Sequence, residues 1–124
     1  MRNQPKYGFI KNTTYAFAGF KSVFKYETSF KIELVIAILL VPVILFIDFS
    51  LIEKLLLFYS IMFVLVGEII NSAIERVVDL VTLEYHDLAK AAKDVGSLIV
   101  LSSIFTSSII WSVILLDHFY GCFS

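Results

Sequence analysis

A run of twenty-two uncharged residues, from Val95 to Leu116, constrains the fold of this chain more than any other feature. An α-helix of that length covers the roughly 30 Å hydrocarbon core of a bilayer. The other segments are also apolar: 59% of the 124 residues are hydrophobic, only 17% are charged, and the mean hydropathy is +0.88. Soluble domains do not have this composition. The sequence therefore predicts an all-α membrane protein.

Two further segments predict membrane-spanning helices, so that one domain, residues 1–124, contains three spans. The first span covers about residues 31–48 and contains Pro42. A proline is tolerated there because neighbouring helices in a membrane can satisfy the freed carbonyl. The second covers about residues 52–80 and the third, which includes the uncharged run, about residues 92–117.

The segment 11–30 predicts an amphipathic helix on the membrane surface. Three phenylalanines recur at the spacing i, i+3, i+7 and form an apolar stripe. They are Phe17, Phe20 and Phe24. Lys21 and Lys25 can reach lipid phosphates from the same segment. The lysines also interrupt its apolar residues, which argues against a cleaved signal peptide.

Basic residues crowd the N-terminal segment and the link between the second and third spans. They are Arg2, Lys6, Lys11, Lys21, Lys25 and Lys31 in the first place, and Arg76, Lys90 and Lys93 in the second. The first link holds only Lys54, and no Lys or Arg follows the third span. The positive-inside rule therefore predicts a cytoplasmic N-terminus and an external C-terminus.

Two bulk properties exclude other classes of protein. The net charge of −1 provides no basic field for nucleic acid. The single cysteine, Cys122, excludes an intrachain disulfide and a cysteine-based zinc site.

Five polar residues interrupt the second span near its predicted cytoplasmic end. They are Glu68, Asn71, Ser72, Glu75 and Asp79. At 100° per residue they share one narrow face of a helix. A carboxylate at bilayer depth costs at least roughly 2.5 kcal/mol, so this face must meet protein, water, a metal or a ligand.

A second polar face begins the next helix. It consists of His86, Lys90, Lys93, Asp94 and Ser97. If the second and third spans pack as an antiparallel hairpin, the two faces meet near the cytoplasmic boundary. Glu27 and Glu33 lie where the surface helix enters the first span, and we expect them to join the same cluster.

This combination of residues indicates phosphoryl transfer from a nucleotide to a lipid alcohol. Carboxylates with oxygen-only partners favour Mg²⁺, which leaves its other positions to water and substrate phosphates. Lysines neutralise phosphate oxygens, and a carboxylate at the boundary can deprotonate a lipid hydroxyl. Nucleotide-binding loops such as G-x-x-x-x-G-K-[ST] and GxGxxG are absent from the sequence. The pattern alone leaves ion pathways, proton-coupled transport and helix pairing open.

Two long motifs resemble the prokaryotic diacylglycerol kinase family. They are EIINSAIERVVD, residues 68–79, and EYHDLAKAAKDVGS, residues 84–97. The segment YAFAGFKSVFKYETSFKIE, residues 15–33, is similar to the family's surface helix and entry to the first span. The resemblance implies a homotrimer with shared active sites in a bacterial cytoplasmic (inner) membrane. It also implies that ATP and Mg²⁺ are used to phosphorylate diacylglycerol to phosphatidic acid.

The resemblance further implies roles for individual residues. Glu68 matches the general base, and Glu27 and Glu75 match carboxylates that bind the metal and face the nucleotide. Lys93 matches a lysine that contacts phosphate, and Asp94 matches its neighbour that contacts the nucleotide.

Other residues match positions around these. His86, Tyr15 and Glu84 are expected near the nucleotide base. Asn71 is expected beside the metal and phosphates, and Glu68, Asn71 and Ser97 are expected to contact the lipid. The supporting motif positions are Asp79 and Gly96.

The chain departs from the family pattern in two places. Leu98 and Ile99 stand where the family often has small residues, which predicts altered helix packing. Phe17 and Phe24 stand where tryptophans are common, which predicts weaker interfacial anchoring.

Three other functions compete with a diacylglycerol kinase. An undecaprenol kinase belongs to the same family. A small proton-coupled multidrug exporter also carries a membrane glutamate, but it has four spans and a C-terminus inside. A non-catalytic assembly subunit would be insensitive to Glu68→Gln.

Overall fold

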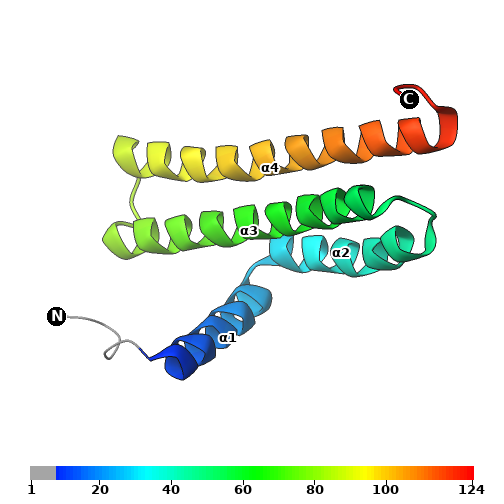
Figure 1. The fold of residues 1–124 in the computed structure, drawn as a ribbon. Helices are drawn as coiled ribbons and strands as arrows, with labels where there is room; N and C mark the ends of the chain where they lie inside the picture. Colours follow the sequence, from blue (N-terminus) through cyan, green and yellow to red (C-terminus); the bar gives the residue numbers. More distant parts are fainter. Residues whose placement is uncertain (1–7) are drawn as a thin grey trace.

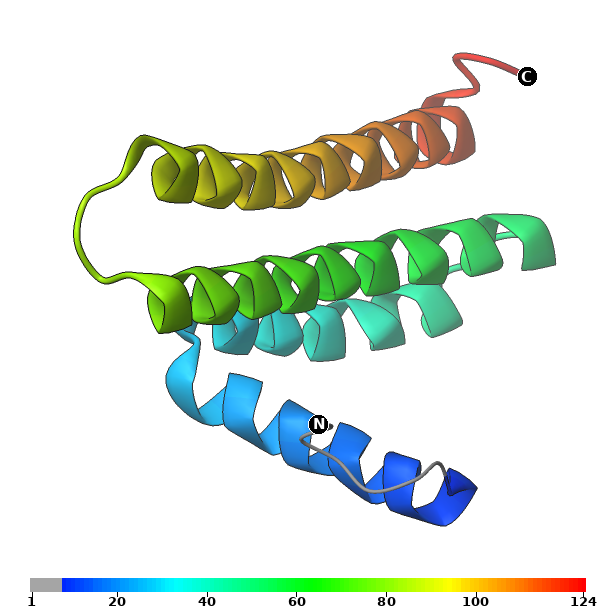
Figure 2. The ribbon, with the colours of Figure 1, turned by 90° about the vertical axis from the view of Figure 1, so that its left-hand side faces the viewer.

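The computed structural model describes residues 8–124, which form four α-helices. They are α1 (Phe9–Tyr26), α2 (Thr28–Phe46), α3 (Leu51–Val81) and α4 (Asp87–Tyr120). Figures 1 and 2 show α3 between α2 and α4, with α1 running obliquely to the other helices. Helices α2, α3 and α4 are long and apolar enough to cross a membrane. The predicted all-helical fold with three spans is confirmed. Arg2 and Lys6, counted in the basic N-terminal segment, lie outside the described residues.

Two helix boundaries differ from those expected from hydropathy. Helix α1 gives way to α2 at Glu27, whose backbone is extended with φ −108° and ψ 106°, rather than at residue 30. Helix α4 begins at Asp87, before the apolar run, because Nδ1 of His86 accepts a hydrogen bond of 3.1 Å from the Leu88 amide and caps the helix. Hydropathy marks the part of a helix that lies in hydrocarbon and does not mark the capped end.

The link between α2 and α3 is fixed by a capping box. Oγ of Ser50 accepts a hydrogen bond of 3.2 Å from the Glu53 amide, and Oε2 of Glu53 accepts one of 2.7 Å from the Ser50 amide. Two of the otherwise unpaired amides at the start of α3 are thereby satisfied. The box sets where α3 begins, and so sets the register of the polar face further along it.

Small residues bring α3 and α4 close together. A Cβ added to Gly67 would lie 2.9 Å from Oγ of Ser103, and one added to Gly96 would collide with Oδ1 of Asn71. Van der Waals contact of this kind holds helices together in lipid, where the hydrophobic effect between them is lost. Of the two departures from the family pattern, Leu98 is exposed, whereas Ile99 is partly buried and its carbonyl lies near Gly67 of α3.

Helix α3 is longer than a bilayer requires. Its 31 residues extend about 46 Å at 1.5 Å per residue, against a hydrocarbon core of about 30 Å. If the core begins at Leu51, it ends about 20 residues later, near position 70. The polar face of α3 therefore starts at the second membrane boundary and continues beyond it.

Candidate active site

Glu68 lies half-buried on α3, surrounded by other carboxylates. Three glutamates are near enough for their negative charges to act on it: Glu33, Glu75 and Glu27. Glu75 lies two turns further along α3, Glu33 belongs to α2, and Glu27 is the residue between α1 and α2. The structure thus brings together the four glutamates that the sequence separates by up to 48 positions.

Glu27 is held by two side chains of α3. Its Oε1 atom accepts a hydrogen bond of 2.8 Å from Oγ of Ser72 and lies 3.7 Å from a guanidinium nitrogen of Arg76. The carboxylate is only partly exposed. These contacts connect the start of α2 to the polar face of α3.

Asn71 occupies the middle of the polar face and faces α4. Its Nδ2 atom donates a hydrogen bond of 3.2 Å to Oε1 of Glu75. Its Oδ1 atom is buried against Gly96 and has no hydrogen-bond partner among residues 8–124. Buried polar atoms are nearly always paired, so this oxygen remains able to accept a hydrogen bond or to coordinate a cation.

The carboxylates do not form a complete metal cage. Within the described part of the chain, no group of three or more His, Cys, Asp or Glu side chains is placed to hold a metal ion. Magnesium is commonly bound by only one or two carboxylates, with water and substrate phosphate as the other ligands. On the polar face, Glu75, Asn71 and the nearby Glu27 have the oxygen ligands that such an ion takes.

Lys93 links α4 to the far end of the same face. Its Nζ atom lies 2.6 Å from Oδ1 of Asp79 on α3. Lys90 instead pairs with Asp94 on its own helix, also at 2.6 Å, and both of these side chains are exposed. Of the two lysines on the polar face of the third span, Lys93 alone reaches across to α3.

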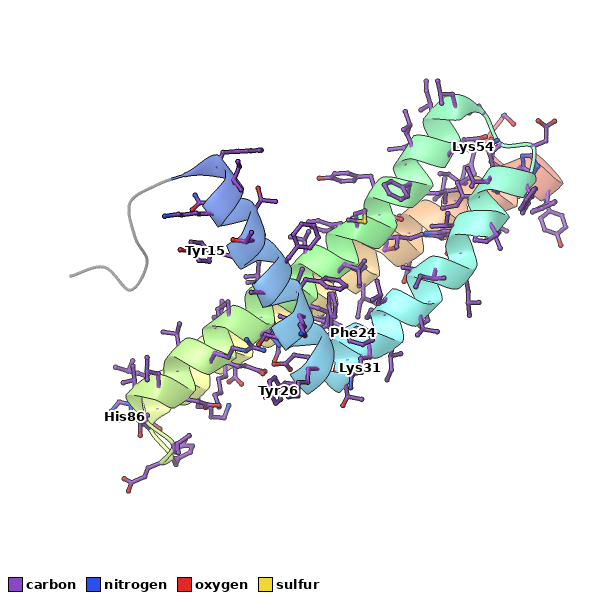
Figure 3. The ribbon with its side chains drawn as sticks, turned by 90° about the horizontal axis from the view of Figure 1, so that it is seen from below. Tyr15, Phe24, Tyr26, Lys31, Lys54 and His86 are labelled. Carbon is purple, nitrogen blue, oxygen red and sulfur yellow. The ribbon has the colours of Figure 1, made fainter. Side chains whose placement is uncertain are left out.

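A pocket of about 420 Å³ lies at the turn between α3 and α4. Its lining includes four predicted nucleotide-binding residues: Glu84, His86, Lys93 and Asp94. We call it the turn pocket. Figure 3 shows His86 at the opposite end of the helical bundle from Lys54. The turn pocket thus lies at the end of the molecule where the polar face of α3 extends beyond the bilayer.

Two predicted site residues, Tyr15 and Ser97, neither line this pocket nor belong to the polar face of α3. Tyr15 belongs to α1 and is not among the residues that line the pocket, and Figure 3 separates it from His86. Ser97 follows the buried Gly96 and is exposed on the outer side of α4.

Arg76 and Ser22 belong to the site but were missed in the sequence. In the sequence Arg76 contributes only to the predicted topology, although it lies one turn after Ser72 on the same side of α3. Its NH1 atom donates a hydrogen bond of 2.9 Å to Oγ of Ser22 on α1. The helical period predicts Ser72 as part of the polar face, but it does not predict that Ser72 holds Glu27. The arginine at i+4 from Ser72 was the available signal.

Comparison with known proteins decides the family. The family model for prokaryotic diacylglycerol kinases matches residues 14–115. The chain belongs to the prokaryotic diacylglycerol kinase family. A diacylglycerol kinase of Escherichia coli is 40% identical over 110 residues, which cover 89% of this chain and 90% of that protein. One of Haemophilus influenzae is 40% identical over 106 residues, covering 86% and 90%.

Another relative acts on a different lipid. An undecaprenol kinase of Bacillus subtilis is 33% identical over 89 residues, which cover 72% of each chain. Membership of this kinase family makes the chain an enzyme and implies ATP as its phosphate donor. With three apolar helices of sufficient length, it also indicates a protein of the bacterial inner membrane. The family and the three candidate spans among residues 8–124 both argue against a four-span exporter.

Proposed function

We propose that this diacylglycerol kinase homologue transfers the γ-phosphate of ATP to the hydroxyl of diacylglycerol, with Mg²⁺, at the cytoplasmic membrane surface. One observation carries the proposal. The polar face of α3 starts near the membrane boundary at Glu68 and runs through Asn71 and Glu75 to the Lys93–Asp79 pair beside the turn pocket. A lipid hydroxyl and a soluble nucleotide can meet along such a face.

The chemistry of Asn71 and Glu75 supports a magnesium site. Their side chains are 3.2 Å apart, and the amide carries an unpaired buried oxygen. As the amide stands, Oδ1 faces Gly96 and Nδ2 faces Glu75, so binding the ion would require a half-turn that exchanges the two atoms and brings Oδ1 beside Glu75. Neighbouring ligands at 2.1 Å in an octahedron are about 3.0 Å apart, which matches this spacing. Glu75, Asn71 and Glu27 would hold the ion. When bound, Mg²⁺ would neutralise negative charge on the phosphate oxygens.

Glu68 is the proposed general base. Its carboxylate accepts the proton of the lipid hydroxyl as the hydroxyl oxygen forms a bond to the γ-phosphorus. The bond from the γ-phosphorus to the bridging oxygen breaks, and ADP leaves. Lys93 donates to the phosphate oxygens, and Asp79 fixes the position of its ammonium group.

The nucleotide is proposed to occupy the turn pocket, with His86 and Glu84 near the base and Lys93 and Asp94 near the phosphates. Tyr15 lies away from the turn pocket of its own chain, so its expected contact with the nucleotide requires another protomer. A homotrimer with shared active sites meets that requirement. It also gives the outward-facing Ser97 a place between protomers, near the lipid.

Helix α1 is proposed to lie on the cytoplasmic surface of the membrane. Phe17, Phe20 and Phe24 are exposed in the single chain and would enter the interface. The N-terminus would then be cytoplasmic and the C-terminus external, as the distribution of lysine and arginine predicts.

Undecaprenol is the second candidate substrate, because an undecaprenol kinase is also a relative. The deciding experiment offers each lipid separately to the purified protein in mixed micelles with Mg²⁺ and γ-³²P-ATP. Label in phosphatidic acid supports the first proposal. Label only in the polyprenyl product moves the assignment to undecaprenol, and label in neither lipid from an intact oligomer contradicts a lipid kinase.

A further inference from the structure

Arg76 is the side chain that ties α1 to α3. One guanidinium nitrogen donates a 2.9 Å hydrogen bond to Oγ of Ser22, and another lies 3.7 Å from Oε1 of Glu27. The arginine side chain is 43% exposed, so it is not needed to fill a core. A planar guanidinium presents several donors in a fixed fork and can serve two acceptors at once. Arg76 therefore contacts α1 and the α1–α2 junction simultaneously.

Glu27 is a hinge as well as an acidic residue. It is the single residue between α1 and α2, and it is extended where its neighbours are helical. The tilt of α1 relative to α2 is set by the backbone at this position, so the tilt also influences where the Glu27 carboxylate points. Ser22 lies five residues before the hinge, on α1. The contact of Arg76 with Ser22 consequently acts on the tilt of α1, whereas its contact with Oε1 of Glu27 acts directly on the position of the carboxylate.

The apolar side chains of α1 and α3 do not fill the space between the two helices. A groove of about 450 Å³ lies between them, lined by residues that include Phe20, Val23, Phe30 and Ile69. Arg76 lies at this groove and reaches across it to Ser22. Val23 of α1 is buried in the apolar core, and the Arg76–Ser22 hydrogen bond adds a polar tie between α1 and α3 beside it.

The two oxygens of Glu27 have different surroundings. Oε1 accepts the hydrogen bond from Ser72 and forms the ion pair with Arg76. Oε2 makes no hydrogen bond or ion pair within residues 8–124. One oxygen is anchored and the other is left available to a cation or to water.

We propose that Arg76 is a positioning residue of the kinase. It sets the tilt of α1 through Ser22 and anchors Oε1 of Glu27, so that Oε2 is presented to the divalent cation. The proposal rests on the assignment of Glu27 as a magnesium ligand. It predicts that loss of Arg76 lowers the affinity of the enzyme for Mg²⁺. Electrostatics alone predicts the opposite, because removing a positive charge from beside a cation site raises its affinity for a cation.

The test compares Arg76→Gln and Ser22→Ala with the wild-type enzyme in mixed micelles. Lys11→Gln is the matched control, because it removes one positive charge from the far end of α1. Three quantities are measured: the KM for Mg²⁺ at saturating ATP, the binding of Mn²⁺ by electron paramagnetic resonance without lipid substrate, and amide hydrogen exchange over residues 22–27.

We expect Arg76→Gln to raise the KM for Mg²⁺ and the Kd for Mn²⁺ by roughly three- to tenfold, the size expected from one lost polar contact. Exchange over residues 22–27 should be faster. Ser22→Ala should speed exchange in the same way with a smaller change in Mn²⁺ binding, because the Glu27 contact remains. Lys11→Gln should resemble the wild type. Ser22→Ala removes one oxygen from a partly exposed side chain, so it tests the tie even if Arg76→Gln does not fold.

Unchanged exchange in both variants would overturn the tie between α1 and α3. Tighter Mn²⁺ binding by Arg76→Gln would overturn the positioning role. It would show that Arg76 affects the cation site only through the repulsion between its positive charge and the cation. Failure of the kinase proposal would give a different pattern, in which the wild type itself transfers no phosphate while the exchange and Mn²⁺ measurements still report on Arg76.

Discussion

The Nζ atom of Lys93 lies 2.6 Å from Oδ1 of Asp79, joining α4 to α3 fourteen residues away in sequence. Both side chains are nearly half exposed, with relative exposures of 42% and 46%. An exposed ion pair contributes only about 0–1 kcal/mol to stability. Its main consequence is positional, because it directs the ammonium group toward the polar face of α3 beside the turn pocket.

Replacing Asp79 with asparagine tests this positional role. We expect Asp79→Asn to retain a folded oligomer while the KM for ATP rises and kcat falls, each by a factor of about 3–10 from one lost charge-assisted contact. Lys93→Met should lose roughly 10²–10³ in kcat, as for removal of a donor to developing charge. Steady-state kinetics and thermal unfolding are measured together. A lowered unfolding temperature with wild-type kinetics for Asp79→Asn would make the pair purely structural.

Gly96 is predicted to be required for the position of Asn71. A methyl group at Gly96 would collide with Oδ1 of Asn71, and the Nδ2 atom of the same amide donates a hydrogen bond to Glu75. Alanine normally stabilises a helix by up to about 1 kcal/mol relative to glycine, yet Gly96→Ala should reduce kcat about 10²-fold, the effect of a displacement near 1 Å at reacting groups. Gly19→Ala is the control, since a Cβ there meets nothing within 4 Å. Equal activity of the two variants would contradict the prediction.

Trp111 and Ser60 provide a stability test within the membrane span. Nε1 of Trp111 donates a 3.0 Å hydrogen bond to Oγ of Ser60, which is 1% exposed and donates to the carbonyl of Leu57 at 2.7 Å. Trp111→Phe should lower the free energy of unfolding by about 1 kcal/mol through the lost hydrogen bond. The smaller side chain should lower it further through lost packing contacts. Reversible unfolding in mixed micelles measures it, with Ser60→Ala completing a double-mutant cycle. A coupling energy of zero would show that the bond contributes nothing.

The orientation in the membrane is open to a direct test. The lysines and arginines predict that a reporter fused after Ser124 lies outside the cytoplasm. Alkaline phosphatase should therefore be active there and green fluorescent protein dark. The reverse pattern would place the turn pocket outside the cell and remove its access to cytoplasmic ATP.

The sequence was sufficient for those features that depend on one helix at a time. The 3.6-residue period put Glu68, Asn71 and Glu75 on one face, and the uncharged run fixed the third span. A helix has one side-chain direction per residue, so spacing alone determines which residues share a face. The all-helical fold with three spans followed from the same signals.

Contacts between helices could not be predicted in this way. Lys93 meets Asp79, and Arg76 meets Ser22, because of the register of two packed helices and the tilt of a third. That register depends on close approach at Gly67 and Gly96, which no single-helix pattern reveals. The start of α4 was also hidden, since His86 caps the helix nine residues before the uncharged run begins at Val95.

The most direct test of the account is the rate of γ-³²P transfer to diacylglycerol by Glu68→Gln. The substitution preserves shape and removes the base, so we expect the rate to fall by at least about 10³-fold while the oligomer elutes as the wild type does. Asp48→Asn, which removes an exposed carboxylate at the other end of the bundle, should retain the wild-type rate. Transfer by Glu68→Gln at or near the wild-type rate would contradict the assignment of Glu68 as general base, and with it the proposed mechanism.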